Sequence, residues 1–304
     1  MEMNGIVVKV QSRRFTVRAD GEETHVVVPN RLRHEAPEWV DPVAVGDVVR
    51  LRRDGDETVI EEVLPRRNGL SRPASGREGK RQMIAANLDA AVVVLAAAEP
   101  EWKPATIDRY LVLASAADVA GIVVINKIDL DPGTRDRSEL EAYRTDLGIP
   151  VVFTSALSGE GMETLTAALN ARTAVLLGPS GAGKTSLLNR LVPGAGRRVD
   201  AISDSTGKGR HTTTWVERLD LPDGGHLVDS PGLRVLDLSG VEPEDLAHHF
   251  PEIASLAPGC RFPDCRHRTE PDCAVKAGVD AGTVRAHRYD SSLRIMESLE
   301  RGRG

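Results

Sequence analysis

The chain has 304 residues, of which 40% are hydrophobic and 28% are charged, and its formal net charge is −6. This length allows two or three domains, and the composition is typical of a globular protein with a buried core rather than of a disordered chain. No apolar run reaches the ~20 residues of a membrane span, and the N-terminus lacks a secretory pattern, so we expect a cytoplasmic protein without membrane contacts.

The charge is unevenly distributed along the chain. Residues 82–254 carry 24 acidic and 15 basic side chains, whereas the parts on either side are close to neutral. The stretch 64–81 has one acidic residue and six basic ones, which are Arg66, Arg67, Arg72, Arg77, Lys80 and Arg81. Such a segment either follows a phosphate backbone or forms a solvated hinge, and the sequence leaves both open.

The first 65 residues show the alternation of short β-strands. The pattern occurs at 5–10, 13–19, 23–29, 46–53 and 57–63, and turn residues separate the runs. Five short strands at this spacing predict a small β-barrel, and periodicity does not separate an OB fold from an SH3-like barrel. We expect an OB-type barrel over 1–65, followed by a basic linker over 66–85.

From residue 86 to 240 the pattern changes to continuous apolar runs that alternate with helical segments. The runs lie at 89–97, 121–126, 149–155, 173–178 and 226–229. Buried strands linked by helices predict an α/β domain with a largely parallel sheet. Residues 241–304 then look helical around a cluster of cysteines.

The most specific motif in the chain is a phosphate-binding loop. It follows an apolar strand, precedes an amphipathic helix and comprises Gly178, Pro179, Ser180, Gly181, Ala182, Gly183, Lys184 and Thr185. Glycines let consecutive backbone N–H groups point at phosphate oxygens in front of a helix N-terminus. Lys184 would neutralise the β- and γ-phosphates, and the Thr185 hydroxyl would bind Mg²⁺.

A second motif, Asn126-Lys127-Ile-Asp129, follows the strand that ends at residue 125. The Asp129 carboxylate can accept hydrogen bonds from N1–H and the 2-amino group of guanine, and adenine offers neither donor. Asn126 would brace the loop and reach N7 of the base, while the stem of Lys127 would cover the ring. Together with the phosphate-binding loop, this motif predicts a guanine nucleotide site.

Three further short motifs complete the nucleotide site. Asp229 in the sequence DSPG would hold Mg²⁺ through water, and the amide of Gly232 would meet the γ-phosphate. Ser155-Ala156 follows another strand, where a backbone N–H could reach the guanine oxygen. Thr213 stands in the segment GRHTTT, between the phosphate-binding loop and DSPG, where a threonine that senses Mg²⁺ and the γ-phosphate is needed.

The order of these motifs along the chain is permuted. A common GTPase has the phosphate-binding loop first and the guanine motif later, whereas here the guanine motif at 126 precedes the loop at 178 and DSPG at 229. Such an order arises when the two termini of the common GTPase domain are joined and the chain is opened at another place. The site geometry can be kept, because the ends of compact domains often lie close together. The segment after DSPG is thereby placed next to the cysteine cluster.

All three cysteines lie within 14 residues of the C-terminal part. Together with one histidine they form the pattern Cys260-x₄-Cys265-x-His267-x₅-Cys273. Three thiolates and one imidazole are the closed tetrahedral ligand set of structural Zn²⁺. The alternative is three buried free cysteines beside a surface histidine.

With these motifs, the chain resembles the RsgA/YjeQ family of circularly permuted GTPases over almost its whole length. The resemblance implies an α/β circularly permuted P-loop GTPase domain over 86–240, flanked by an RNA-binding OB-type barrel and a helical zinc-binding domain over 241–304. It also implies GTP hydrolysis to GDP, stimulated by the 30S ribosomal subunit during its late maturation, with contacts to 16S rRNA. The expected cofactors are one structural Zn²⁺ and Mg²⁺ with GTP, and we expect a monomer.

Leu233 follows DSPG, where Ras-type enzymes have a glutamine that orients water, so slow intrinsic turnover is expected. The resemblance indicates His211 as the residue that positions water, with Lys184 and Thr213 as the other catalytic residues. Two alternatives remain. One is a nucleotide-gated rRNA-binding scaffold with incidental hydrolysis, and the other is a P-loop ATPase or kinase in which the guanine motif is accidental.

Overall fold

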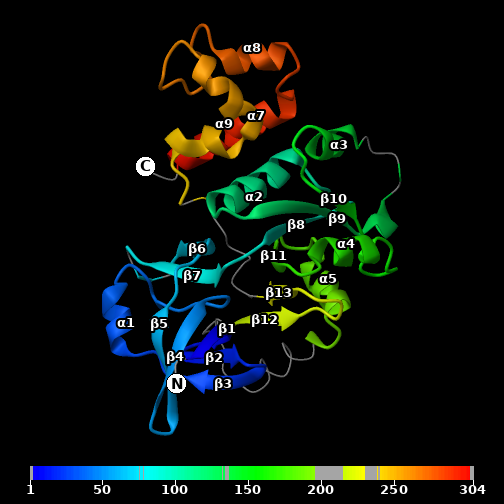
Figure 1. Cartoon of the computed structure of the whole chain (residues 1–304). Helices are drawn as coiled ribbons and strands as arrows, with labels where there is room; N and C mark the ends of the chain where they lie inside the picture. Colours follow the sequence, from blue (N-terminus) through cyan, green and yellow to red (C-terminus); the bar gives the residue numbers. More distant parts are fainter. Residues whose placement is uncertain are drawn as a thin grey trace.

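A computed structural model describes residues 3–74, 76–77, 79–131, 133, 137–195, 215–229, 238 and 240–301. An N-terminal barrel, a central sheet with helices and a C-terminal helical part follow one another along the chain (Figure 1). In these described ranges, no helix is both long and apolar enough to cross a membrane.

The N-terminal part is a five-stranded barrel, as the alternation predicts. Its elements are β1 (Met3–Gln11), β2 (Arg14–Ala19), β3 (Glu22–Val26), α1 (Asn30–Glu35), β4 (Val48–Asp54) and β5 (Glu57–Val63). β1 pairs with β2 and β4, β2 pairs with β3, and β4 pairs with β5. A parallel bridge between Val27 and Val59 brings the end of β3 to β5 and closes the barrel. This is the OB-type arrangement, and its core includes Phe15 and Ile60.

The basic stretch after the barrel is a β-hairpin, which differs from the open linker that the sequence suggested. β6 (Gly69–Pro73) and β7 (Arg81–Ala86) pair with each other, and β7 also forms bridges to Trp39 and Val45 of the barrel. The hairpin folds because Leu70 and Ile84 are buried in an apolar core. In the sequence, the many basic residues between these two positions hide the apolar pattern.

The side chains of the basic stretch are largely occupied within the molecule. Arg66 pairs with Asp47, Arg67 pairs with Asp89, and Arg72 and Arg81 bond to neighbours across the hairpin. The stretch is therefore a paired hairpin, while Arg77 and Lys80 near its turn are exposed.

The central sheet has helices on both faces. Its strands are β8 (Ala90–Ala96), β9 (Ala120–Asn126), β10 (Val151–Phe153), β11 (Thr173–Leu177), β12 (Trp215–Asp220) and β13 (His226–Asp229). Its helices are α2 (Pro104–Ala116), η1 (Ile128–Leu130), α3 (Ser138–Thr145), α4 (Met162–Leu169) and α5 (Lys184–Leu191).

The spatial order of the strands is β10-β9-β8-β11-β13-β12. All neighbours are parallel except β12, which pairs antiparallel with β13. The phosphate-binding loop, the guanine motif, Ser155 and Asp229 therefore all lie at the carboxyl edge of the sheet, where parallel strands place ligand-binding residues.

The barrel continues the central sheet. β1 pairs antiparallel with the edge strand β12, so that Lys9 lies opposite Glu217 and Val10 opposite Val216. The two parts form one sheet of eleven strands. No pattern in the sequence indicated this junction.

The C-terminal part packs against the central sheet through α2. Its elements are η3 (Pro243–His249), α7 (Pro251–Leu256), η4 (Ala257–Gly259), α8 (Ala274–Asp280) and α9 (Ala286–Arg301). One apolar cluster joins it to the other parts, since Val112 of α2, Leu70 of the hairpin and Ile295 of α9 belong to the same core.

Candidate functional site: a guanine nucleotide site and a Cys3His cluster

The phosphate-binding loop runs from the end of β11 to the start of α5. Gly178 has φ of +137°, and a Cβ there would lie 2.0 Å from the carbonyl oxygen of Val94, so only glycine fits. The Lys184 ammonium donates to the carbonyl oxygens of Gly178 and Pro179 at 2.6 and 2.7 Å. Ala182 is buried, whereas Ser180, Gly181 and Thr185 are exposed at the edge of the sheet. The loop thus wraps around the lysine and presents its outer residues to a ligand.

Asn126 fastens the guanine motif to this loop. It is buried, with 1% of its surface exposed, and its Nδ2 donates to the carbonyl oxygen of Ala182 at 3.1 Å. Its Oδ1 accepts from the Thr154 hydroxyl at 3.2 Å and from the backbone N–H of Ala156 at 3.1 Å. One amide therefore ties three loops together at the carboxyl edge.

Asp129 and Lys127 are positioned by separate contacts. The buried Ser155 donates its hydroxyl to Oδ1 of Asp129 at 2.5 Å, which orients an otherwise exposed carboxylate. Lys127 has φ of +62°, and its Nζ donates to the carbonyl oxygen of Glu99 at 2.6 Å. The carboxylate of Asp129 and the stem of Lys127 thus lie at the same edge of the sheet. Recognition of guanine requires both, one for the hydrogen-bonding edge of the base and one for the face of its ring.

Two oxygen donors stand where Mg²⁺ would be held beside the phosphates. Asp229 ends β13, which is parallel to β11, and Thr185 is the second residue of the helix that follows β11. Carboxylate and hydroxyl oxygens are the ligands that Mg²⁺ prefers, together with water and phosphate oxygens. The donor set therefore fits Mg²⁺.

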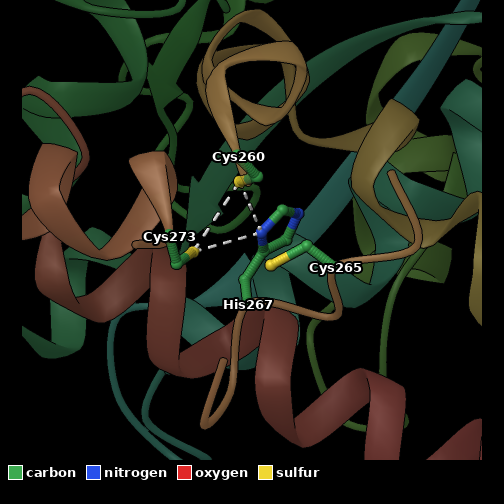
Figure 2. Close-up of side chains that lie close together, drawn as sticks. All are labelled: Cys260, Cys265, His267 and Cys273. Atoms are coloured by element: carbon green, nitrogen blue, oxygen red, sulfur yellow. Dashed lines mark hydrogen bonds between the residues drawn. The ribbon is translucent and has the colours of Figure 1, made fainter. Parts of the chain in front are cut away.

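The three cysteines and His267 converge on one point in the C-terminal part (Figure 2). One ligand atom from each of the four residues lies within 4.8 Å of all the others. The Nδ1 of His267 is 3.6 Å from Sγ of Cys260 and 3.4 Å from Sγ of Cys273. Such a group can hold a metal ion in the closed manner of a structural site.

The surroundings of the cluster favour metal ligation. Burial lowers the pKa of His267, which keeps the imidazole neutral, as ligation requires. Burial alone would raise the pKa of Cys260, but hydrogen bonds from the backbone at Val275 and Ala274 outweigh it, and the pKa lies below its ordinary value. Burial raises the pKa of the Cys265 thiol to about 12, so this thiol loses its proton only when a cation binds it.

Known proteins resemble the chain over its full length. The model of the RsgA GTPase family matches residues 63–239. A small ribosomal subunit biogenesis GTPase RsgA from Gemmatimonas aurantiaca is 40% identical over 299 residues, which are 97% of this chain and 97% of the relative. A relative of the same name from Streptomyces coelicolor is 39% identical and covers 94% of this chain and 80% of its own. The chain belongs to the RsgA GTPase family.

Solved structures of similar proteins agree with this membership. The crystal structure of YjeQ from Thermotoga maritima has a TM-score of 0.80 and 33% identity, and covers 98% of this chain and 99% of its own. The structure of YloQ, titled a circularly permuted GTPase, has a TM-score of 0.72 and 29% identity over 99% and 96% of the two chains. The permuted GTPase fold expected from the motif order is confirmed.

The structure brings together most of the nucleotide-site residues that the sequence indicated in this RsgA-family chain. The phosphate-binding loop, Asn126, Asp129 and Ser155 form one connected group. Asp229 lies on the neighbouring strand. His211, Thr213 and Gly232 lie outside the described residues.

Sequence reasoning missed two residues at this edge. Thr154 supports the amide of Asn126, and the carbonyl of Glu99 accepts from Lys127. Thr154 follows the carboxyl end of β10, and Glu99 follows that of β8. Ligand-binding residues are expected after the carboxyl ends of parallel strands, so this signal could have found both.

Proposed function

We propose that this RsgA-family protein hydrolyses GTP to GDP and phosphate and thereby assists late maturation of the 30S ribosomal subunit. The observation that supports GTP most directly is the hydrogen bond from Asn126 to the carbonyl of Ala182, since it joins a guanine motif to a phosphate-binding loop. The relatives named small ribosomal subunit biogenesis GTPase support the partner.

Guanine recognition rests on Asp129. Its carboxylate, oriented by Ser155, would accept hydrogen bonds from N1–H and the 2-amino group of guanine. The backbone N–H of Ala156 already donates to Oδ1 of Asn126, so a contact to the guanine oxygen would come from another N–H of the loop that begins at Ser155. An adenine would leave this carboxylate without a donor, which is an effective form of discrimination.

Phosphate binding rests on the loop from Gly178 to Thr185. Its backbone N–H groups and Lys184 would surround the β- and γ-phosphates. Thr185 and Asp229 would hold Mg²⁺, which when bound neutralises phosphate charge. Of the residues known only from the sequence, Thr213 and Gly232 would contact the γ-phosphate side of the nucleotide, and His211 would position the attacking water.

The flanking parts would contact RNA. We infer that the barrel and the C-terminal part bind 16S rRNA and that the Cys3His cluster holds one structural Zn²⁺, whose ligand set its thiols and imidazole match. The division into a barrel over 1–65, a connecting stretch over 66–85, a GTPase domain over 86–240 and a metal-binding domain over 241–304 stays a prediction. We also propose a cytoplasmic location and a monomer.

The decisive measurement is GTP turnover by the purified protein alone, with 30S subunits and with 50S subunits as a control. We expect slow turnover that rises strongly with 30S only, because Leu233 replaces the glutamine that orients water in Ras-type enzymes. Tight GTP binding without stimulation would instead favour an rRNA-binding scaffold, for which Leu233 is the supporting observation.

The variant Asp129→Asn identifies the base in the same assay. We expect GTP affinity to fall by at least about a hundredfold, since two hydrogen bonds to a charged acceptor are lost. An enzyme that uses ATP would be indifferent to this change.

A further inference from the structure

A row of three charged residues crosses the junction between the barrel and the central sheet. In the antiparallel ladders, Lys9 of β1 lies opposite Glu217 of β12, and Glu217 lies opposite Asp229 of β13. Directly opposite residues point to the same face, with Cβ atoms about 5 Å apart. The row therefore leads from the barrel to the carboxylate that we assign to Mg²⁺.

The packing shows which face the row occupies. Leu219 and Leu227, also opposite each other, lie two positions from Glu217 and Asp229 on the same strands and therefore on the same face. Both leucines belong to the apolar cluster that contains Leu188 of α5. Glu217 and Asp229 thus share the face covered by α5, the helix whose second residue is Thr185.

The charges in this row are only partly exposed. Nζ of Lys9 lies 3.5 Å from Oε1 of Glu217, and their side chains are 29% and 13% exposed. The same ammonium lies 5.8 Å from the ring centre of Trp215. Partly buried charges are screened less by salt than fully exposed ones, so their effect reaches neighbouring groups.

We propose that Glu217 and Lys9 together set the affinity of the nucleotide site for Mg²⁺, with the barrel supplying the opposing charge. This inference rests on the proposed GTPase function. Glu217 adds negative potential beside Asp229 and strengthens the attraction for a divalent cation. Lys9 offsets that potential, so its removal strengthens the attraction further.

The test is a Mg²⁺ titration of the release rate of a fluorescent GDP analogue from the full-length protein. With Glu217→Gln we expect the Mg²⁺ affinity to fall about fivefold, and with Lys9→Met we expect it to rise about threefold. The double variant should lie between the two. All shifts should shrink at high salt.

The opposite signs separate this role from a structural one. Both single variants break the same ion pair, so a merely structural contribution would change Mg²⁺ affinity in the same direction in both. Arg18→Met is the matched control, because Arg18 also crosses the junction, to Asp220 at 2.9 Å. Asp220 lies opposite His226 and not opposite Asp229. We therefore expect Arg18→Met to leave the Mg²⁺ affinity unchanged.

Two outcomes overturn the inference. One is that Glu217→Gln and Lys9→Met shift Mg²⁺ affinity in the same direction, and the other is that neither differs from Arg18→Met. Failure of the proposed function has a separate signature, because the unmodified protein would then bind no guanine nucleotide in the same titration.

Discussion

Gly183 of the phosphate-binding loop lies directly beside Asn126 of the guanine motif. It has φ of +89°, and a Cβ there would lie 2.2 Å from Nδ2 of Asn126. We expect Gly183→Ala to push this amide away from the carbonyl of Ala182 and to weaken GDP binding at least tenfold, the loss of about one hydrogen bond in a buried site. A fluorescence titration with a GDP analogue measures this.

Gly194 provides the matched control at the same scale. Its φ of +91° is almost identical, but none of the described residues has an atom within 4 Å of the position that its Cβ would take. Both substitutions strain the backbone by about 1–2 kcal/mol, whereas only the first displaces Asn126. Equal loss of GDP binding in Gly194→Ala would show that backbone strain, and not the displaced amide, is responsible.

At the scale of elements, a buried ion cluster fastens α9 to α2. Nη1 of Arg288 lies 2.5 Å from Oδ1 of Asp108, and its Nε lies 2.6 Å from Glu252. The side chains of Arg288 and Asp108 are 4% and 0% exposed. The Tyr143 hydroxyl also donates to Asp108, at 2.5 Å. The cluster joins α2, α3, α7 and α9, and thus the central sheet to the C-terminal part.

We expect Arg288→Met to lower the free energy of unfolding by about 3–5 kcal/mol at pH 7.5, because it leaves the buried carboxylate of Asp108 and the partly buried one of Glu252 without their counter-ion. Chemical denaturation measures this. Arg285→Met is the control, since the Arg285–Asp146 pair joins the same two parts at the surface and should contribute little. An equally small effect of Arg288→Met would contradict the assigned role.

The loss of stability in Arg288→Met should also depend on pH. Burial raises the pKa of Asp108, and Arg288 opposes that rise, so the pKa climbs further in Arg288→Met. A carboxyl group whose pKa is raised by folding favours the folded state at low pH and disfavours it as pH rises through that pKa. The difference in free energy of unfolding between Arg288→Met and the unmodified protein should therefore become smaller as the pH is lowered from 7.5 to 5.

At the scale of the whole molecule, the sequence predicts local elements but not the contacts between distant parts of the chain. The strands and the phosphate-binding loop were predictable, because period-2 runs and fixed glycine positions are local signals. The pairing of β1 with β12 joins residues about 200 positions apart through ordinary alternating strands, and the Asp108–Arg288 pair is 180 apart. Nothing local distinguishes these residues, so only the folded chain identifies them.

Because of this long-range pairing, the three parts share one core and should not unfold independently. Val45 of the barrel, Val175 of β11 and Ile253 of α7 belong to the same buried cluster. In addition, the Tyr289 hydroxyl of α9 donates to the carbonyl of His267 at 2.5 Å, which ties the Cys3His cluster to the helix that bears Arg288. Loss of a metal ion bound at that cluster would therefore lower the stability of all three parts.

We expect removal of the metal with a strong chelator to lower the melting temperature of the whole chain by about 10 °C, in a single calorimetric transition. The reason is that a metal ion held by Cys260, Cys265, His267 and Cys273 would stabilise a part that shares its apolar core with the other two. Adding Zn²⁺ back should restore the original transition. If chelation instead produced a separate early transition and left the main one in place, the metal-binding part would be an independent folding unit and the shared core would not couple it to the nucleotide site.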